Sequence, residues 1–229
     1  MQAFCDFDGT ISKHDVTDLV LERFALPEWR DVEKRWEDGE INSAQCMREQ
    51  IRLIRTSKQE LDRFLDDVQI DVEFIGFRNF CAQHEVKLTV VSDGVDYFIR
   101  HILANHGIRD IEIMSNHMIT VTPGDFPGLD LAHPYADPDC RSASGVCKCR
   151  IVGAANGDHI YVGDGRSDFC VVAHEANMVF AKAKLASYCQ EQRIPFTPYI
   201  DFAQVLTALR PLVSKSGAQM PHLIASKTA

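Results

Sequence analysis

The sequence has no long apolar run, no stretch rich in lysine and arginine, and no repeated or low-complexity segment. A membrane-spanning helix needs about 20 consecutive apolar residues, so we do not expect the chain to cross a membrane. A protein that binds nucleic acid normally presents a basic face, whereas the formal net charge here is −9. These absences argue against a membrane protein and against a nucleic-acid-binding protein.

The cysteines follow no pattern of a disulfide scaffold or a zinc knuckle. There are eight, most stand singly among apolar residues, and none forms a Cys-x₂-Cys pair. Because no signal-peptide pattern opens the chain, we expect a cytoplasmic protein with reduced thiols. Cys140, Cys147 and Cys149, with His133 or His117 nearby, leave a zinc site or a redox-sensitive pair as alternatives to reduced thiols there.

What the chain does contain is the composition of an ordinary globular protein. Hydrophobic residues make up 45% and charged residues 25% of the 229 residues. That length is enough for one full domain, or for a main domain with a smaller insertion. Residues 214–229 lack hydrophobic periodicity, so we predict a flexible tail there.

Short apolar runs alternate with amphipathic stretches over much of the chain. Residues 3–7, 87–92 and 159–163 have the apolar character of buried parallel strands, and helical periodicity lies between them. Residues 15–67 are helical in pattern and contain no convincing strand. The pattern predicts an α/β fold with a doubly wound parallel sheet and an inserted helical segment.

The first predicted strand ends in Asp6-Phe7-Asp8-Gly9-Thr10. Parallel sheets bind ligands at the carboxyl ends of their strands, and Gly9 permits a tight turn that aims both carboxylates at one point. One carboxylate can then attack phosphorus while the other protonates the leaving oxygen. Taken alone, an Asp-x-Asp pair is more often a solvated loop, and that alternative stays open at this point.

Three further motifs follow along the chain. The hydroxyl of Ser92 and the backbone N–H groups of Asp93 and Gly94 can hold a phosphoryl oxygen, unless the motif is a plain turn. Lys148 stands at the start of a predicted helix, where a second positive feature suits an anion, although a surface lysine is the alternative.

Gly163-Asp164-Gly165-Arg166-Ser167-Asp168 follows the third strand and opens a helix. Asp164 and Asp168 can bind or orient Mg²⁺, which prefers carboxylate, phosphate and water oxygens. The alternative is an acidic cap on the following helix.

In this order the four motifs resemble those of the haloacid dehalogenase (HAD) superfamily of phosphohydrolases, in its phosphoserine-phosphatase-like branch. The resemblance covers about residues 3–182. It implies a HAD-like Rossmannoid core at residues 1–12 and 76–213, with a helical cap at residues 13–75 that closes over the site. Candidate substrate contacts in the cap are Glu22, Trp29, Arg30, Arg48 and Arg52.

The resemblance also implies a role for each motif residue. Asp6 matches the nucleophile that becomes phosphorylated, Asp8 matches the acid/base residue, and Lys148 matches the lysine that neutralises the intermediate. The residues matched to phosphate binding are Ser92, Asp93, Gly94 and Lys148. The residues matched to Mg²⁺ binding are Asp6, Asp8, Asp164 and Asp168.

Within the superfamily, several stretches are similar to the phosphatases that act on 2-hydroxy-3-keto-5-methylthiopentenyl-1-phosphate in methionine salvage. They are residues 5–11, 27–29, 92–98 and 145–149. Ser92-Asp93-Gly94 departs from that pattern, because Ser-Gly-Gly is expected there.

The sequence therefore predicts Mg²⁺-dependent hydrolysis of a small phosphorylated metabolite through an aspartyl-phosphate intermediate. Phosphoserine phosphatase is the alternative enzyme, and a non-catalytic phosphometabolite-binding regulatory protein is the alternative from another class. Phosphoryl transfer to another alcohol stays open, and so does the oligomeric state, for which a homodimer is one alternative. We expect no nucleic-acid or membrane partner.

Overall fold

The computed structural model describes residues 1–140 and 142–213, so the predicted tail at 214–229 lies outside the described residues. The strands are β1 (Gln2–Cys5), β2 (Lys87–Val95), β3 (Glu112–Thr122), β4 (Gly128–Ala132), β5 (His159–Gly163), β6 (Met178–Ala181) and β7 (Thr197–Pro198). The helices of the first half are α1 (Val16–Phe24), α2 (Trp29–Glu37), α3 (Ser43–Ile51), α4 (Lys58–Asp66), α5 (Glu73–Gln83) and α6 (Asp96–Asn105). Those of the second half are α7 (Lys148–Gly153), the 3₁₀ helix η1 (Arg166–Asp168), α8 (Phe169–His174), α9 (Ala183–Gln192) and α10 (Phe202–Val213).

One sheet of seven strands runs through the molecule in the order β4-β3-β2-β1-β5-β6-β7. All neighbouring pairs are parallel except β3 and β4, which form an antiparallel hairpin at one edge. The chain first builds β2 and β3 on one side of β1 and later builds β5, β6 and β7 on the other. The strand order therefore reverses beside β1, and the carboxyl ends of β1, β2 and β5 meet at this switch point.

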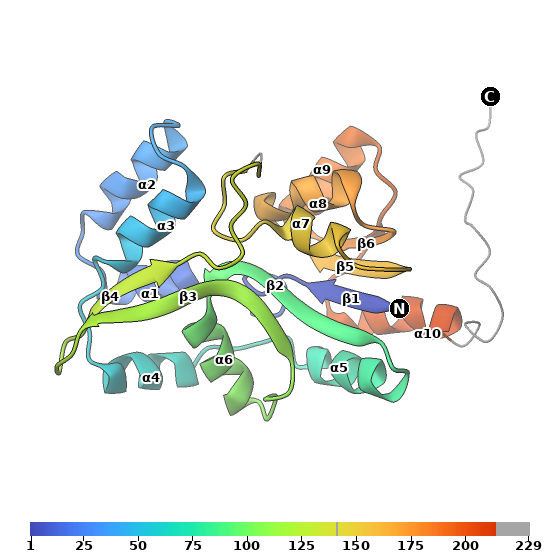
Figure 1. Cartoon of the computed structure of the whole chain (residues 1–229). Helices are drawn as coiled ribbons and strands as arrows, with labels where there is room; N and C mark the ends of the chain where they lie inside the picture. Colours follow the sequence, from blue (N-terminus) through green and yellow to red (C-terminus); the bar gives the residue numbers. More distant parts are fainter. Residues whose placement is uncertain (141, 214–229) are drawn as a thin grey trace.

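Helices cover both faces of the sheet, as the predicted doubly wound α/β fold requires (Figure 1). Alternate residues of β1 divide between the two faces, because successive side chains of a strand point in opposite directions. Ala3 and Cys5 pack in the core that includes α5, α6 and α10, whereas Phe4 packs with α7, α8 and α9. The sheet is thus buried on both sides, which explains its nearly continuous apolar strands.

The first four helices all belong to the segment predicted to be helical. α2 and α3 rise beyond the carboxyl edge of the sheet, while α4 lies along the opposite side next to α6 (Figure 1). Asn42 and Ser57 precede α3 and α4 with capping boxes, in which each side chain accepts the backbone N–H group of the residue three positions later. The O–H group of Tyr97 on α6 donates to Asp62 on α4, which fixes α4 against the core rather than over the site.

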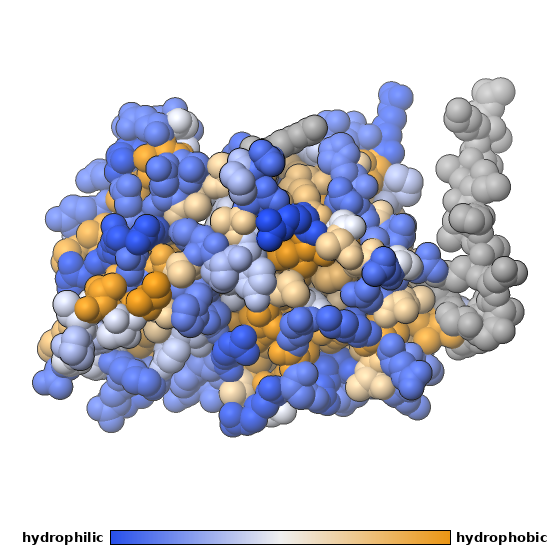
Figure 2. Space-filling model, in the orientation of Figure 1, coloured by the Kyte–Doolittle hydropathy of each residue, from blue (hydrophilic) through white to orange (hydrophobic). Residues whose placement is uncertain are grey.

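Differences from the predicted elements are confined to element ends and to the sheet edges. β2 continues past Ser92 to Val95, which pairs with Asn116 of β3 after a shift in register. The two-residue strand β7 follows no apolar run and was not predicted. In the described part of the chain, no helix has the length and apolar character needed to cross a membrane. The face in Figure 2 is largely hydrophilic, with smaller hydrophobic areas between.

Candidate active site

The four motifs converge at the carboxyl ends of β1, β2 and β5. Asp6 follows β1, and its backbone N–H donates to the carbonyl of Val162 on β5 at 2.9 Å. This register brings the end of β1 level with the loop that carries Asp164 and Asp168. One carboxylate oxygen from each of Asp6, Asp164 and Asp168 lies within 4.8 Å of the others.

Lys148 lies in the middle of this acidic group. Its Nζ atom is 2.8 Å from Asp6 Oδ2, 2.8 Å from Asp168 Oδ1 and 2.9 Å from Ser167 Oγ. Only 1% of the residue is exposed. Burial alone would lower the pKa of Lys148, but the charges of Asp168 and Asp6 outweigh it and hold the pKa above its usual value. Lys148 is therefore a permanent buried cation.

Asp6 is buried and has a fixed orientation. Its Oδ1 atom accepts the N–H group of Phe7 at 2.7 Å, and its Oδ2 atom faces Lys148. Burial raises the pKa of Asp6 well above the usual value, and the charge of Lys148 opposes that rise. The ion pair favours the ionised form, which is the form that a nucleophilic carboxylate needs.

Asp8 has a different environment from Asp6. Its Oδ1 atom accepts the N–H group of Val16 at 2.9 Å, and its Oδ2 atom lies 3.4 Å from the hydroxyl of Ser92. Burial first, and then the negative charge of Asp15, raises the pKa of Asp8 well above the usual value. Burial raises the pKa of both carboxyl groups, and the difference between them is that Asp6 alone forms a direct ion pair with Lys148.

The Ser92-Asp93-Gly94 motif lies against Asp8, inside the extended β2 strand. The N–H group of Gly94 donates to Ser92 Oγ at 3.0 Å. A Cβ atom at position 94 would collide with the Asp8 carboxylate, so this approach requires glycine. The motif is therefore part of a strand end and not the plain turn that was its alternative.

The departure at position 93 has a structural role. Asp93 Oδ1 accepts the N–H group of Val146 at 3.1 Å, which ties the second motif to the loop that precedes Lys148. Burial raises the pKa of Asp93 to about 6, while Lys148 opposes the rise. The amide of Asn116 donates to the carbonyl of Asp93 and thereby holds the same segment from β3. Sequence reasoning missed Asn116, a buried polar residue of β3 next to the buried Ser115.

The carboxylates of the fourth motif, Asp164 and Asp168, accept hydrogen bonds from several neighbouring groups. Thr10 Oγ1 donates to Asp164 Oδ1 at 2.8 Å. Asp168 Oδ2 accepts the N–H groups of Asp164 and Gly165 at 3.2 and 3.1 Å, and the O–H group of Tyr161 donates to Asp168 Oδ1. Tyr161 is the second residue that the sequence did not single out.

The donor set fits a divalent cation. Five carboxylates (Asp6, Asp8, Asp93, Asp164 and Asp168) gather here, and Lys148 ion-pairs with two of them. Burial and the charge of Asp168 raise the pKa of Asp164, even though Thr10 donates to it. A hard cation with oxygen ligands would relieve this excess of negative charge. The residues that would hold it are Asp6 and Asp164, with Asp168 beside them.

Asp6, Asp8, Asp93 and Asp164 line one side of a cleft of about 1560 Å³. Lys148 and Asp168 are buried behind them, in contact with Asp6 and with the backbone of Asp164. We refer to these six residues as the floor of the cleft. Helices α1, α2 and α3 provide the opposite wall, with the side chains of Asp15, Asp18, Glu33, Trp36 and Met47. We refer to these five residues as the helical wall.

The candidate substrate contacts chosen from sequence do not line this cleft. Arg48 and Arg52 each bind Asp130 of β4 through two hydrogen bonds of 2.8–2.9 Å. Trp29 is buried, and the guanidinium group of Arg30 lies 4.5 Å from its ring centroid. These side chains attach the helices to the protein and do not reach the site.

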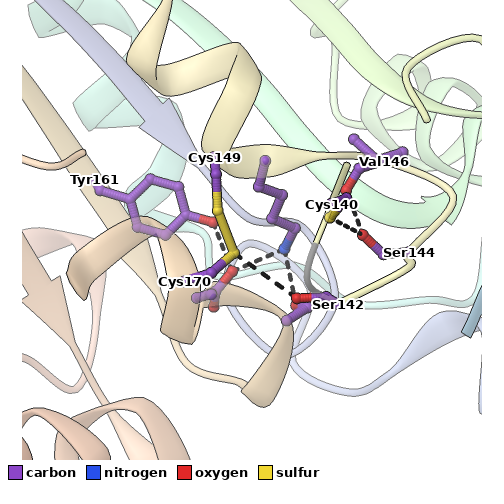
Figure 3. Close-up of a disulfide and its surroundings, with 10 residues drawn as sticks. Cys140, Ser142, Ser144, Val146, Cys149, Tyr161 and Cys170 are labelled. Atoms are coloured by element: carbon purple, nitrogen blue, oxygen red, sulfur yellow. Dashed lines mark hydrogen bonds and ion pairs between the residues drawn. A yellow bond between two sulfur atoms is a disulfide. The ribbon is translucent and has the colours of Figure 1, made fainter. Parts of the chain in front are cut away.

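The cysteines correct one expectation. Cys149, directly after Lys148, forms a disulfide with Cys170 of α8, so the prediction of reduced thiols is wrong for this pair (Figure 3). The six other cysteines are free. Within residues 1–140 and 142–213, Cys140, Cys147 and Cys149 form no metal-binding group with a histidine.

Comparisons with known proteins agree with this geometry. The family profile described as Putative Phosphatase matches residues 2–194. A protein from Bacillus thuringiensis subsp. konkukian (strain 97-27) called 2-hydroxy-3-keto-5-methylthiopentenyl-1-phosphate phosphatase is 31% identical over 218 residues, which cover 93% of this chain and 97% of the relative.

Two solved structures share the fold. A phospho-aspartyl intermediate analogue of phosphoserine phosphatase superposes with a TM-score of 0.64 at 17% identity, covering 90% of this chain and 97% of that one. A HAD family hydrolase from Salmonella enterica serovar Typhi gives a TM-score of 0.67 at 17% identity, covering 91% of this chain and 70% of that one. Because the family profile spans most of the residues that build the cleft, this chain belongs to the Putative Phosphatase family and is a phosphoric monoester hydrolase with a HAD-type fold.

Proposed function

We propose that this phosphatase uses Mg²⁺ and an aspartyl-phosphate intermediate on Asp6 to hydrolyse 2-hydroxy-3-keto-5-methylthiopentenyl-1-phosphate. The observation that carries the proposal is the position of Lys148 Nζ, 2.8 Å from both Asp6 Oδ2 and Asp168 Oδ1, beside three clustered carboxylates. Phosphoryl transfer between anions needs positioning and charge neutralisation above all, and this arrangement supports both.

In the first step, an oxygen of the Asp6 carboxylate attacks phosphorus and the ester P–O bond breaks. Asp8, whose raised pKa favours the protonated form, gives its proton to the departing alkoxide. The products of this step are the free alcohol and phosphorylated Asp6.

In the second step, Asp8 takes a proton from a water molecule whose oxygen attacks phosphorus. The bond between phosphorus and the Asp6 oxygen breaks, which releases inorganic phosphate and restores the carboxylate. The same carboxyl group thus acts first as acid and then as base, so the cycle regenerates the starting enzyme.

The phosphoryl oxygens need donors that stay in place during both steps. Ser92 Oγ and Lys148 Nζ are the side-chain donors that we assign to them, with the backbone of Asp93 and Gly94 beside them. The N–H group of Gly94 already donates to Ser92 Oγ, which orients that hydroxyl. Lys148 has acceptors at Asp6, Asp168 and Ser167. A phosphoryl group therefore replaces one of these partners on binding.

We assign Mg²⁺ binding to Asp6, Asp8, Asp164 and Asp168. Three of these residues, Asp6, Asp164 and Asp168, each have a carboxylate oxygen within 4.8 Å of the other two. When bound, the ion neutralises phosphoryl oxygens and so reduces their repulsion of Asp6. Thr10 and the N–H group of Phe7 hold Asp164 and Asp6 in position for it.

Within the segment at residues 13–75, which we propose as the cap, substrate choice is assigned to the part that precedes α4, because α4 packs against the core. Its α1, α2 and α3 helices supply the helical wall opposite the motif residues. The relative from Bacillus thuringiensis carries the name of the proposed substrate and aligns over 93% of this chain. This alignment includes both the floor and the cap, which is why the substrate is carried over with the chemistry.

The chemistry is tested with an aryl phosphate and the variant Asp6→Asn. We expect turnover that requires a divalent cation, is lost on chelation, is restored by Mg²⁺, and is abolished by the substitution. Asp110→Asn is the matched control, because it makes the same change at an exposed carboxylate that binds Arg78 far from the cleft. Full activity in Asp6→Asn would refute the assignment of the nucleophile.

The substrate is tested with a panel of phosphorylated metabolites that includes phosphoserine. We expect kcat/KM for 2-hydroxy-3-keto-5-methylthiopentenyl-1-phosphate to exceed that for phosphoserine by a wide margin. A preference for phosphoserine would leave the mechanism intact and replace the substrate.

A further inference from the structure

Tyr161 is a fully buried tyrosine in the middle of β5. Its ring belongs to the core beneath α7, α8 and α9, where Phe4, Val91 and Val179 pack around it. A phenylalanine would fill that space equally well. The hydroxyl is the feature that core packing does not explain, since a buried O–H group is kept only where it has a partner.

The partner of this hydroxyl is Asp168 Oδ1. The same oxygen accepts Lys148 Nζ at 2.8 Å, while Asp168 Oδ2 accepts the N–H groups of Asp164 and Gly165. The carboxylate of Asp168 therefore receives four donors, and Tyr161 supplies the one that comes from the sheet. In Figure 3 the hydroxyl of Tyr161 points from its ring toward the Cys149–Cys170 disulfide.

The fit between Tyr161 and Asp168 is close. A Cβ atom at Gly163 would meet both the Asp168 carboxylate and, at 3.0 Å, Cε1 of Tyr161. Tyr161 and Asp168 thus both occupy space that a side chain at Gly163 would fill. Burial, reinforced by the charge of Asp168, raises the pKa of Tyr161 well above its usual value, so the hydroxyl remains a donor.

The hydrogen bond between Tyr161 and Asp168 affects Asp6 indirectly, because both carboxylates contact Lys148. The ammonium group lies between Asp6 and Asp168 at equal distances of 2.8 Å, so its position depends on the charge that each carboxylate presents. The Tyr161 hydroxyl offsets part of the charge on the Asp168 oxygen that faces Lys148. Without it, Asp168 would attract Lys148 more strongly, at the expense of Asp6 and of any phosphoryl group beside Asp6.

We propose that Tyr161 is a positioning residue for phosphoryl binding, which acts through Asp168 to keep Lys148 available to Asp6 and to the phosphoryl oxygens. The inference rests on the proposed roles of Asp6 and Lys148. It assigns a function to the hydroxyl group by which Tyr161 differs from a buried phenylalanine.

The test is Tyr161→Phe, which removes a single oxygen atom. We expect kcat/KM for an aryl phosphate and the affinity for inorganic phosphate, measured as a competitive Ki, each to fall about tenfold or more, as expected for a buried hydrogen bond to a charged group. A purely structural loss would lower the amount of folded enzyme without moving the phosphate Ki.

Tyr199→Phe is the matched control. Tyr199 is also buried, and its hydroxyl donates to the carbonyl of Gly163 at 3.3 Å. Its side-chain hydrogen-bond partner is Thr10, whereas that of Tyr161 is Asp168. Both variants should melt at a lower temperature than the parent, but only Tyr161→Phe should weaken phosphate binding. Equal phosphate Ki values for the parent and Tyr161→Phe would overturn the inference.

A double variant covers the case in which Tyr161→Phe does not fold. In Tyr161→Phe with Asp168→Asn, the lost hydroxyl no longer faces a charge, so we expect this protein to fold and its phosphate Ki to equal that of Asp168→Asn alone. Unfolding of the double variant as well would assign Tyr161 to packing and overturn the inference. The proposed function would be refuted by a different result, namely activity in the Asp6→Asn variant.

Discussion

The floor of the cleft and its helical wall are built in opposite ways. On the floor, Asp6, Lys148 and Asp168 are at most 4% exposed, and each has partners within 3 Å. On the wall, Asp15 and Asp18 are exposed, and Trp36 is half-buried with a single hydrogen bond to Ser43. The difference separates two tasks: groups that react need fixed positions, whereas groups that select a substrate need a surface that can be reached.

The wall is nevertheless anchored to the sheet. Arg48 of α3 and Arg52, the residue that follows this helix, share the carboxylate of Asp130, which is 7% exposed. This cluster lies at the hairpin edge of the sheet, away from the motif residues. Substitutions in this anchor or on the wall leave every floor residue in place, and four predictions compare the two regions on that basis.

The largest effect is expected on the floor, from Lys148→Met. Removal of the cation leaves Asp6 and Asp168 as unpaired buried carboxylates, which costs about 3–5 kcal/mol of unfolding free energy. Turnover of an aryl phosphate should fall by about three orders of magnitude, as for loss of a charge-stabilising donor. Lys58→Met removes an exposed lysine paired with Asp62 at 2.6 Å and should change either quantity little. Activity within about tenfold of the parent in Lys148→Met would contradict the role of the lysine.

The next effect is expected from Asp130→Asn, which loosens the anchor. The two arginines lower the pKa of Asp130, so its contribution to stability is present above the ordinary aspartate pKa of about 4 and is lost as pH falls below it. We expect the substitution to cost about 2 kcal/mol at neutral pH and less in acid. Thermal melts of both proteins between neutral and acidic pH measure this. A cost that grows in acid would exclude the assignment.

A smaller effect is expected from Trp36→Phe on the wall. The change removes the indole N–H group that donates to Ser43 at 3.0 Å and reshapes the surface facing the floor. KM for the metabolite should rise about threefold to tenfold, while kcat for an aryl phosphate stays near that of the parent. Trp29→Phe, on the same helix but buried away from the cleft, is the control. Equal loss of kcat on both substrates would place Trp36 in the chemistry.

The smallest effect is expected where the wall meets the floor. Asp15 raises the pKa of Asp8 through its charge, second only to burial, so Asp15→Asn should lower that pKa. The alkaline limb of the rate profile, where Asp8 loses its proton, should therefore move to lower pH. Asparagine is as good a helix cap as aspartate, so α1 should be preserved. A limb that stays in place or moves upward would refute the coupling.

The residues of the floor could be predicted from the sequence, whereas those of the wall could not, and the reason is physical. Asp6, Ser92 and Asp164 each follow an apolar run, and the ends of parallel strands meet at one edge of a sheet, so local patterns determine their neighbourhood. In the sequence, Arg48 and Arg52 have no evident partner in the helical segment, so they were candidates for binding the substrate. Their partner Asp130 is about 80 residues away in the chain, and only the folded hairpin brings it close.

Two other features had no signal in the sequence. Tyr161 fits the apolar pattern of β5, so its hydroxyl contact with Asp168 is invisible until the loop after the strand is placed. Cys149 and Cys170 are 21 residues apart on different helices, and spacing alone does not predict that they pair. Alternation predicted the α/β class, but strand order came from the structure.

The central claim is that Asp6 carries the phosphoryl group during turnover. Enzyme mixed with substrate and Mg²⁺ is quenched in acid, reduced with borohydride and digested, and the peptide containing residue 6 is analysed by mass spectrometry. An acyl phosphate is reduced to the alcohol, so the account predicts homoserine at position 6 only when substrate is present. Homoserine at another aspartate, or at no position while phosphate is released under the same conditions, would contradict it.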